Sequence, residues 1–213
     1  MSRNFQKCLL DPEQCTVLIV DHQSQMYFGV ESHPRQSVRN AVIMLAKSCK
    51  AFKVPCIYTT IAKDTFSGPV DEELMKVFPD TKLYDRTAIN CWEDEPLKKA
   101  VKDTKNKKIV IAGLWTEACT LFPAVSMKED GYDVYVVTDA CGGATKEAHD
   151  MAVLRMVQAG VVPVTSEQVC LEWQRNWANT ETYDAVMEIC KQHGGAYGLG
   201  IQMAEKMIPA YHQ

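Results

Sequence analysis

The stretch KKIVIAGLWTEACTLFPA, residues 107–124, decides the fold class of this chain. It opens with an apolar run rich in β-branched residues, which is typical of a buried strand, and then passes into a helical segment. Thr116 suits the N-cap position of that helix, which would place Cys119 at the third helical position. The stretch therefore predicts a β–α unit with a cysteine where the strand meets the helix.

The same alternation continues on both sides of this unit. Strand-length apolar segments are expected at residues 15–22, 54–60, 82–86, 107–114, 133–140 and 161–166. Helix-length segments are expected at residues 34–52, 71–78, 93–104, 116–131 and 145–160. Near-continuous apolar strands in a β–α–β–α order are typical of a parallel sheet. We therefore expect an α/β fold: a doubly wound, mostly parallel sheet of about six strands with helices on both faces, in three α/β/α layers.

The chain contains neither a linker-like segment nor an internal repeat. Its 213 residues suit one domain with a full hydrophobic core. We expect a single domain over residues 1–213, in which residues 167–213 form a helical C-terminal extension with a glycine break at HGGAYGLG. Trp173 and Trp177 in this extension would pack on the chain's own core or form a subunit contact.

Composition narrows the class of function. The net charge is −4 and the isoelectric point is near 5.8, which argues against a nucleic-acid-binding protein. Apolar runs stay well short of the roughly 18 residues that a membrane span needs. The first residues, MSRNFQKCLLDPEQ, are polar and unlike the apolar core of a signal peptide. We expect a cytoplasmic protein that acts on a small molecule, with neither nucleic acid nor membrane as a partner.

Nine cysteines are scattered through the chain, and none of them forms a C-x-x-C pair. Zinc-ribbon and thioredoxin-like functions therefore receive no support. We expect reduced thiols, most of them small core residues. The cysteines are Cys8, Cys15, Cys49, Cys56, Cys91, Cys119, Cys141, Cys170 and Cys190.

In an open parallel sheet, ligands bind beyond the carboxyl ends of the strands. The residues that end the expected strands are Asp21, His22, Gln23, Thr59, Thr60, Arg86, the segment 114–119 and the segment 139–143. This filter selects Cys119 from the nine cysteines and leaves Cys141 as a weaker second candidate.

Cys119 has features of a nucleophile. The free N–H groups and the positive end of a helix would favour its thiolate and could hold an oxyanion. Pro123 cannot donate a hydrogen bond to the carbonyl of Cys119, so we expect a distorted first turn. The alternative at this stage is an inert, buried cysteine.

Asp21 follows the apolar run TVLIV and is the candidate base, because partial burial would raise the pKa of its carboxyl. The alternatives are a carboxylate that caps a loop, or His22 as the base, on the opposite face of the strand. Gln23 shares the face of Asp21. Arg86 would hold Asp21 ionised or anchor an acidic substrate group, unless it forms a surface ion pair with a nearby acid, Asp85 or Glu93.

Four segments resemble the isochorismatase-like cysteine hydrolases, a family that includes nicotinamidases and N-carbamoylsarcosine amidases. They are VLIVDHQ (17–23), VPCIYTT (54–60), IVIAGLWTEACTLFPA (109–124) and DVYVVTDACGG (133–143), and the G-x-x-T-E-x-C element is the most specific of their motifs. The segments FPDTKLYDRTAINCWEDE (78–95) and CLEWQRNW (170–177) are similar to the YcaC-type subgroup of octameric hydrolases.

The resemblance implies a catalytic triad with Cys119 as nucleophile, Asp21 as base, and Arg86 where most of the family has lysine. It also implies a cis peptide bond before the threonine of the motif, at Trp115–Thr116. The backbone N–H of Trp115 or Thr116 would then face the oxyanion beside that of Cys119. A homo-oligomer, such as an octamer, is implied as well.

The resemblance further bears on cofactors and substrate contacts. Nicotinamidases carry an Asp-x-His metal motif after the second strand, where this chain reads IAKDTFSGP without histidine. We therefore expect no metal and no cofactor, and nicotinamide becomes a less favoured substrate. Gln23, Phe28, Thr60 and Trp115 are the expected substrate-binding residues, with Phe28 and Trp115 as apolar walls.

The function expected from these residues is a cysteine-dependent hydrolase that cleaves a C–N bond of a small amide or carbamoyl-type substrate through a thioester. One alternative is a non-catalytic or vestigial binding protein on the same fold. Another is a thiol redox protein that uses Cys119, with Cys141 as a partner that could approach it in space.

Overall fold

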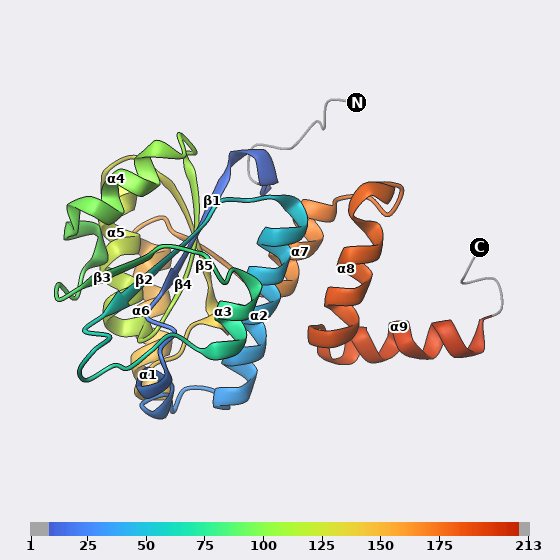
Figure 1. Ribbon diagram of the computed structural model, residues 1–213, viewed down its shortest axis with the longest axis horizontal. Helices are drawn as coiled ribbons and strands as arrows, with labels where there is room; N and C mark the ends of the chain where they lie inside the picture. Colours follow the sequence, from blue (N-terminus) through green and yellow to red (C-terminus); the bar gives the residue numbers. More distant parts are fainter. Residues whose placement is uncertain (1–8, 209–213) are drawn as a thin grey trace.

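The computed structural model describes residues 9–208, which form a parallel sheet flanked by helices (Figure 1). Six strands lie in the order β3-β2-β1-β4-β5-β6, and every neighbouring pair is parallel. They are β1 (Cys15–Val20), β2 (Cys56–Ile61), β3 (Leu83–Arg86), β4 (Lys108–Gly113), β5 (Asp133–Val137) and β6 (Val162–Val164). The direction of winding reverses between β1 and β4, so the predicted doubly wound fold is confirmed.

Helices cover both faces of the sheet (Figure 1). One face carries α2 (Arg35–Phe52), α3 (Glu72–Val77) and α7 (Ser166–Gln174), and the other carries α4 (Glu95–Asp103), α5 (Leu121–Glu129) and α6 (Lys146–Gln158). The short helix α1 (Ser24–Phe28), which the periodicity did not predict, follows β1 at the edge where the strands end.

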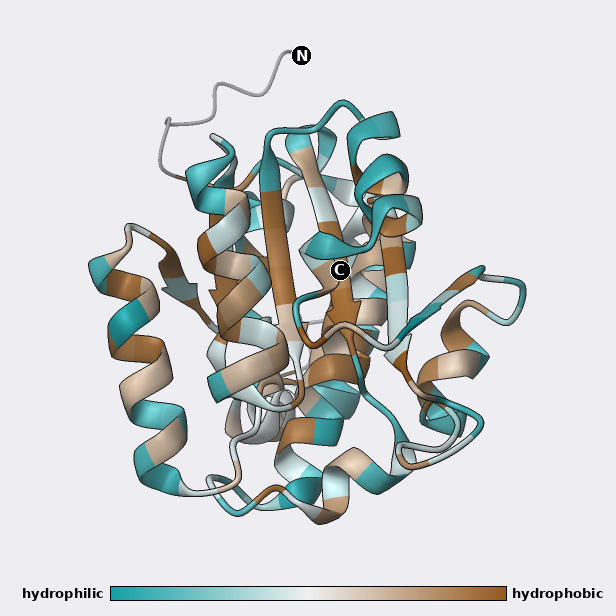
Figure 2. Ribbon diagram, turned by 90° about the vertical axis from the view of Figure 1, so that its left-hand side faces the viewer, coloured by the Kyte–Doolittle hydropathy of each residue, from teal (hydrophilic) through white to brown (hydrophobic). Residues whose placement is uncertain are grey.

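Strand β1 illustrates why the sequences of the strands are continuous apolar runs. All six of its residues are buried. Val17 and Ile19 pack in the core beneath α2, whereas Leu18 and Val20 pack in the core beneath α4 and α5. Because successive side chains point to opposite faces, a strand covered on both sides needs apolar residues at every position. Figure 2 shows the inner strands as predominantly hydrophobic.

The described part of the C-terminal extension, residues 167–208, is mostly helical, and its first two helices pack on α2. Trp173 is fully buried, and its ring lies 5.8 Å from that of Phe52, so this tryptophan belongs to the chain's own core. Trp177 is half exposed. Helix α8 (Thr180–His193) packs on α2, and α9 (Gly195–Met207) projects beyond it (Figure 1). The glycine break is confined to Gly194, because α9 continues through the later glycines.

The cysteines mostly serve the core. Within residues 9–208 the eight cysteines are free thiols, and seven of them are buried. Cys8 lies outside the described residues. Among the helices of the same range, none is long and apolar enough to cross a membrane.

Gly113, at the end of β4, can be used to test how closely the sheet packs against the turn that follows. A Cβ at this position would lie 2.6 Å from Thr120 Oγ1 and 2.8 Å from Val20 Cβ. We expect Gly113→Ala to lower the free energy of unfolding by about 1–3 kcal/mol, measured by urea denaturation. Gly200→Ala in α9 is the matched control, because among the described residues its Cβ meets nothing within 4 Å. Equal losses in the two variants would contradict this account.

Candidate active site

Asp21 is the first residue after β1, at the point where the winding of the sheet reverses. Its backbone N–H donates to the carbonyl of Thr59 on the neighbouring strand, at 3.0 Å. Its φ of 55° lies in the left-handed region, which non-glycine residues rarely adopt and which is often found at functional positions. The carboxyl group is fully buried. The predicted placement of Asp21 beyond the strand end, in the interior, is confirmed.

Arg86, the last residue of β3, forms a two-pronged ion pair with Asp21. Nη1 and Nη2 each donate to one carboxylate oxygen at 2.9 Å, and both side chains are at most 1% exposed. Nη1 also donates to the Thr60 carbonyl at 3.0 Å, and Nη2 to the Ile89 carbonyl at 3.4 Å. A planar guanidinium matches a carboxylate in this geometry. The alternative of a surface ion pair for Arg86 is therefore wrong.

Cys119 completes the cluster. The residue is 5% exposed, and its thiol lies beside the carboxyl group of Asp21. The three residues that the sequence singled out, from the ends of β1 and β3 and the turn after β4, thus lie together in the interior: Arg86 pairs with Asp21, and Cys119 interacts electrostatically with both. The side chain that can exchange a proton with the sulfur is Asp21, since a guanidinium stays protonated.

The protonation of Cys119 differs from the expectation. Burial raises the pKa of the Cys119 thiol to about 12, and the charge of Asp21 adds to this effect. Arg86 and a backbone hydrogen bond from Trp115 lower the pKa, but by less. The expected thiolate is therefore wrong for the resting site, where desolvation outweighs the helix terminus. The resting site holds a neutral thiol beside Asp21.

Asp21 has the properties of a general base. Burial raises the pKa of its carboxyl, while the hydrogen bonds and charge of Arg86, and the hydrogen bond from Cys119, lower it. The net direction is upward, as the sequence predicted. Such a carboxylate can accept the thiol proton at the moment the sulfur attacks an electrophile.

The turn that carries Cys119 is distorted, as expected. The segment Thr116–Thr120 is a π-helical turn, and regular α-helix begins only at Leu121 in α5. The N–H of Thr120 reaches back five residues to the carbonyl of Trp115, at 3.3 Å. Pro123 has no N–H to offer the carbonyl of Cys119. Short π turns inside helices are frequent at functional sites.

Thr116 does not act as an N-cap. Its N–H donates to the carbonyl of Gly142 at 2.9 Å, and its Oγ1 is hydrogen-bonded to Nδ1 of His149 at 2.8 Å. The expected oxyanion role of the Thr116 N–H is therefore wrong, because that group is already engaged. The cis peptide bond also lies one position earlier than expected, at Leu114–Trp115. For the N–H groups of Trp115 and Cys119 the oxyanion role stays a prediction.

His22 is a structural residue. Its Nε2 donates to the carbonyl of Ala140 at 2.9 Å, and its ring is 1% exposed. Burial lowers the pKa of the imidazole to about 4, so the ring is neutral at pH 7. The alternative of His22 as the base is wrong, because its Nε2 is engaged with the 138–143 segment rather than with Cys119.

Gln23 and Thr60 were expected to bind substrate, and the structure corrects both. The Gln23 amide donates to the carbonyls of Ile61 and Gly68, at 3.2 and 2.6 Å, and accepts from the Ile61 N–H at 2.9 Å. It therefore clamps the 61–68 loop. Thr60 Oγ1 donates to Asp85 at 2.7 Å, while its carbonyl holds Arg86. Both side chains are fully buried and fully engaged.

The two expected apolar walls differ in exposure. Trp115 is half-buried, its Nε1 donates to the Met26 carbonyl at 2.9 Å, and its ring covers Gly29. Phe28, at the end of α1, is 72% exposed. Their contact with a substrate stays a prediction.

The sequence reasoning missed Cys91 as a neighbour of the cluster. Its buried thiol interacts electrostatically with Arg86, Asp21 and Cys119, and burial raises its pKa to about 12. Its position shortly after the end of β3 was an available signal. Cys141 is fully buried in the core, and burial raises the pKa of its thiol to about 12.

Known proteins share this chain's sequence and fold. Residues 15–168 match the family model of the isochorismatase domain. "Probable hydrolase YcaC" of Escherichia coli is 40% identical over 171 residues, which cover 80% of this chain and 82% of that protein. A structure of YcaC from Pseudomonas aeruginosa, with hexane-2,5-diol and covalent acrylamide, is 35% identical and superposes with a TM-score of 0.89, covering 95% of this chain and all of that one.

The E. coli YcaC structure, described as an octameric hydrolase of unknown specificity, superposes equally well. It is 35% identical to this chain, with a TM-score of 0.89, and the match covers 96% of this chain and all of that one.

The depressed pKa of His22 makes stability depend on pH. Between pH 6.5, the ordinary pKa of histidine, and about pH 4, its pKa in the fold, His22 is protonated in the unfolded chain but neutral in the folded one. The free energy of unfolding should therefore fall as pH falls through this window, by up to about 3 kcal/mol for one imidazole. His22→Gln keeps a donor for Ala140, and its stability should fall less steeply in urea denaturation between pH 7 and 5. Parallel pH profiles would contradict this assignment.

Proposed function

The chain belongs to the isochorismatase family, a family of hydrolases, and from this premise we propose a cysteine-dependent cleavage of a C–N bond. The substrate would be a small amide or carbamoyl compound. The observation that carries the proposal is the buried Cys119 thiol beside the carboxyl group of Asp21, which accepts two hydrogen bonds from the guanidinium of Arg86. A neutral nucleophile next to its base suits attack on an uncharged carbonyl.

The reaction proposed has two halves. In the first, the sulfur of Cys119 attacks the carbonyl carbon while its proton passes to Asp21. The protonated Asp21 then gives this proton to the leaving nitrogen, the C–N bond breaks, and a thioester remains. In the second half, Asp21 takes a proton from water, the hydroxide attacks the thioester, and the thiol is restored as the acid leaves. The N–H groups of Trp115 and Cys119 are the donors that would face the oxyanion.

Arg86 would act without exchanging protons. Its charge opposes the upward shift that burial imposes on the pKa of Asp21 and so favours the ionised form of the base. Its double hydrogen bond also fixes the orientation of the carboxylate. These two tasks need a permanent cation, which arginine supplies.

The relatives support the chemistry and the assembly that we propose. Acrylamide is an electrophile towards thiolates, and the Pseudomonas YcaC structure holds it covalently. The E. coli structure is described as octameric, and we propose a homo-oligomer for this chain as well. The proposed setting is the cytoplasm, where free thiols persist.

The proton transfer to Asp21 can be tested with acrylamide, followed by peptide mapping. We expect the modification rate of Cys119 to change little between pH 7 and 9, because Asp21 accepts the proton. In Asp21→Asn the rate should instead rise about tenfold per pH unit below the pKa of the thiol, because the reaction then follows the thiolate. The other cysteines in the same digest are the internal control. A wild-type rate that rises with pH as steeply as that of Asp21→Asn would refute the role of Asp21.

The hydrolysis itself can be tested with a panel of small amides and carbamoyl compounds. We expect ammonia or amine release from at least one of them, and loss of this release in Cys119→Ala, because the thioester cannot form. Equal release by both proteins would refute the hydrolase assignment for that compound. If the wild type binds compounds of the panel but hydrolyses none of them, this result would favour a binding protein instead.

A further inference from the structure

A chain of three polar residues outside the cluster ends at the turn that carries Cys119. His149, on α6, is hydrogen-bonded through Nδ1 to Thr116 Oγ1 at 2.8 Å. The ring of His33 meets the ring of His149 edge to face, with 4.6 Å between centroids. Ser32 Oγ is hydrogen-bonded to Nδ1 of His33 at 2.9 Å. We call Ser32, His33 and His149 the histidine chain.

The direction of one bond in the histidine chain follows from its neighbours. The backbone N–H of Gly143 donates to Ser32 Oγ at 2.9 Å, so the hydroxyl hydrogen of Ser32 is free to donate to His33 Nδ1. The N–H groups of Glu31 and Ser32 both donate to the Gly143 carbonyl, at 3.0 and 3.3 Å. The 29–34 loop and the loop after β5 are thus tied together by three hydrogen bonds.

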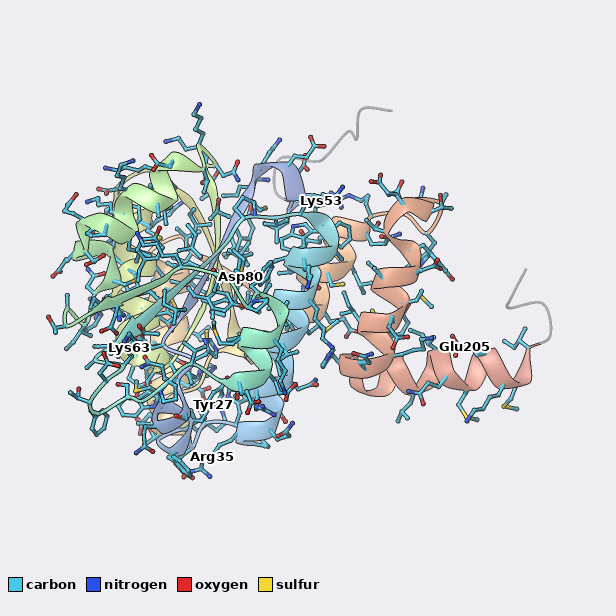
Figure 3. All side chains as sticks on the ribbon, viewed as in Figure 1. Tyr27, Arg35, Lys53, Lys63, Asp80 and Glu205 are labelled. Atoms are coloured by element: carbon cyan, nitrogen blue, oxygen red, sulfur yellow. The ribbon has the colours of Figure 1, made fainter. Side chains whose placement is uncertain are left out.

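The 29–34 loop has its own anchor. Arg35 donates through Nε to the Tyr27 carbonyl at 3.0 Å and through Nη2 to the Phe28 carbonyl at 2.9 Å. Figure 3 shows Tyr27 and Arg35 close together at the edge of the molecule that carries α1. The histidine chain therefore starts from a fixed loop rather than from a free one.

The other end of the histidine chain, His149, is hydrogen-bonded to Thr116, the first residue of the π turn. Thr116 opens the π turn, and its N–H is bonded to the Gly142 carbonyl. The backbone of the preceding residue, Trp115, interacts with the thiol of Cys119 and lowers its pKa. The following residue, Glu117, accepts from the N–H of Ala144 at 2.9 Å. Rotation of Thr116 would therefore displace the groups around the sulfur.

From this geometry we propose that His149 is a positioning residue, which acts through Thr116 to hold the sulfur of Cys119 against Asp21. The inference rests on the proposed function, because it concerns the same thiol.

His149 suits this task because it is buried and neutral. It is 5% exposed, and burial, with help from His33, lowers its pKa to about 4. The other charged groups that face it are Lys146 and Asp150 of its own helix, and Glu117 of the π turn, which meets it across Gly143. A neutral ring can hold the Thr116 hydroxyl without adding a second cation near the Asp21–Arg86 pair.

The test removes either end of the bond to Thr116. Thr116→Val deletes the hydroxyl while keeping the shape, and His149→Leu deletes the ring nitrogens. We expect each variant to slow the modification of Cys119 by acrylamide about tenfold at pH 7, as loss of one hydrogen bond from a positioned nucleophile would do. The flat pH dependence of the wild type should become a rate that rises with pH, because the sulfur no longer meets Asp21. The double variant should be no slower than either single variant.

Control variants distinguish a loss of positioning at Cys119 from a general loss of stability. Thr16 is also fully buried, and its hydroxyl bonds to Thr104 at 2.8 Å, at the opposite end of β1. Thr16→Val should lose a similar amount of stability in urea yet keep the wild-type rate at Cys119. Thr116→Ser and His149→Asn keep a polar atom at the bonding position and should recover to within about threefold of the wild type.

The outcomes are distinct. Wild-type rates of Cys119 modification in Thr116→Val and His149→Leu would overturn the proposal. So would a double variant in which the two losses of rate multiply, or a Thr16→Val variant that is slowed equally. If His149→Leu fails to fold, Thr116→Val and His149→Asn decide. A wild-type rate that rises with pH as steeply as that of Asp21→Asn would instead overturn the proposed function itself.

Discussion

The site depends on one buried ion pair. Asp21 and Arg86 meet through two hydrogen bonds of 2.9 Å in the interior, where removal of either partner would leave an uncompensated charge at a cost of about 3–5 kcal/mol. The pair joins the ends of β1 and β3, two strands that do not neighbour each other in the sheet, across the end of β2. It therefore couples the integrity of the fold to the orientation of a carboxylate that lies against a thiol.

Much of the fold follows from local pattern. Runs such as TVLIV in β1 and IVIAG in β4, set between helix-length segments, are typical of strands in a sheet covered on both faces, which is why the strand positions and their parallel order were predictable. The topology in turn predicted that Asp21, Arg86 and Cys119 would meet, because the ends of parallel strands share one edge. Helix α1 was missed, since five residues are too few to show a helical period.

The remaining errors concern hydrogen-bond partners and burial. Gln23 and Thr60 occupy strand-end positions typical of ligand contacts. Gln23 is engaged by carbonyls of the 61–68 loop, and Thr60 by Asp85 of β3, and sequence spacing does not reveal those partners. Thr116 has the residue type of an N-cap, yet the Gly142 carbonyl takes its N–H. The ionisation of Cys119 was misjudged because the helix-terminus argument was weighed without the depth of burial, which dominates the pKa of this thiol.

The hydrogen-bond acceptors around Arg86 favour arginine over lysine at this position. Four oxygens surround the guanidinium: both from Asp21, and the carbonyls of Thr60 and Ile89. An ammonium group carries three hydrogens, arranged around a point rather than along a planar fork. A lysine at position 86 would thus leave one of these buried oxygens without a hydrogen-bond donor. Replacing Arg86 by lysine would therefore demand a rearrangement of the loop that contains Ile89.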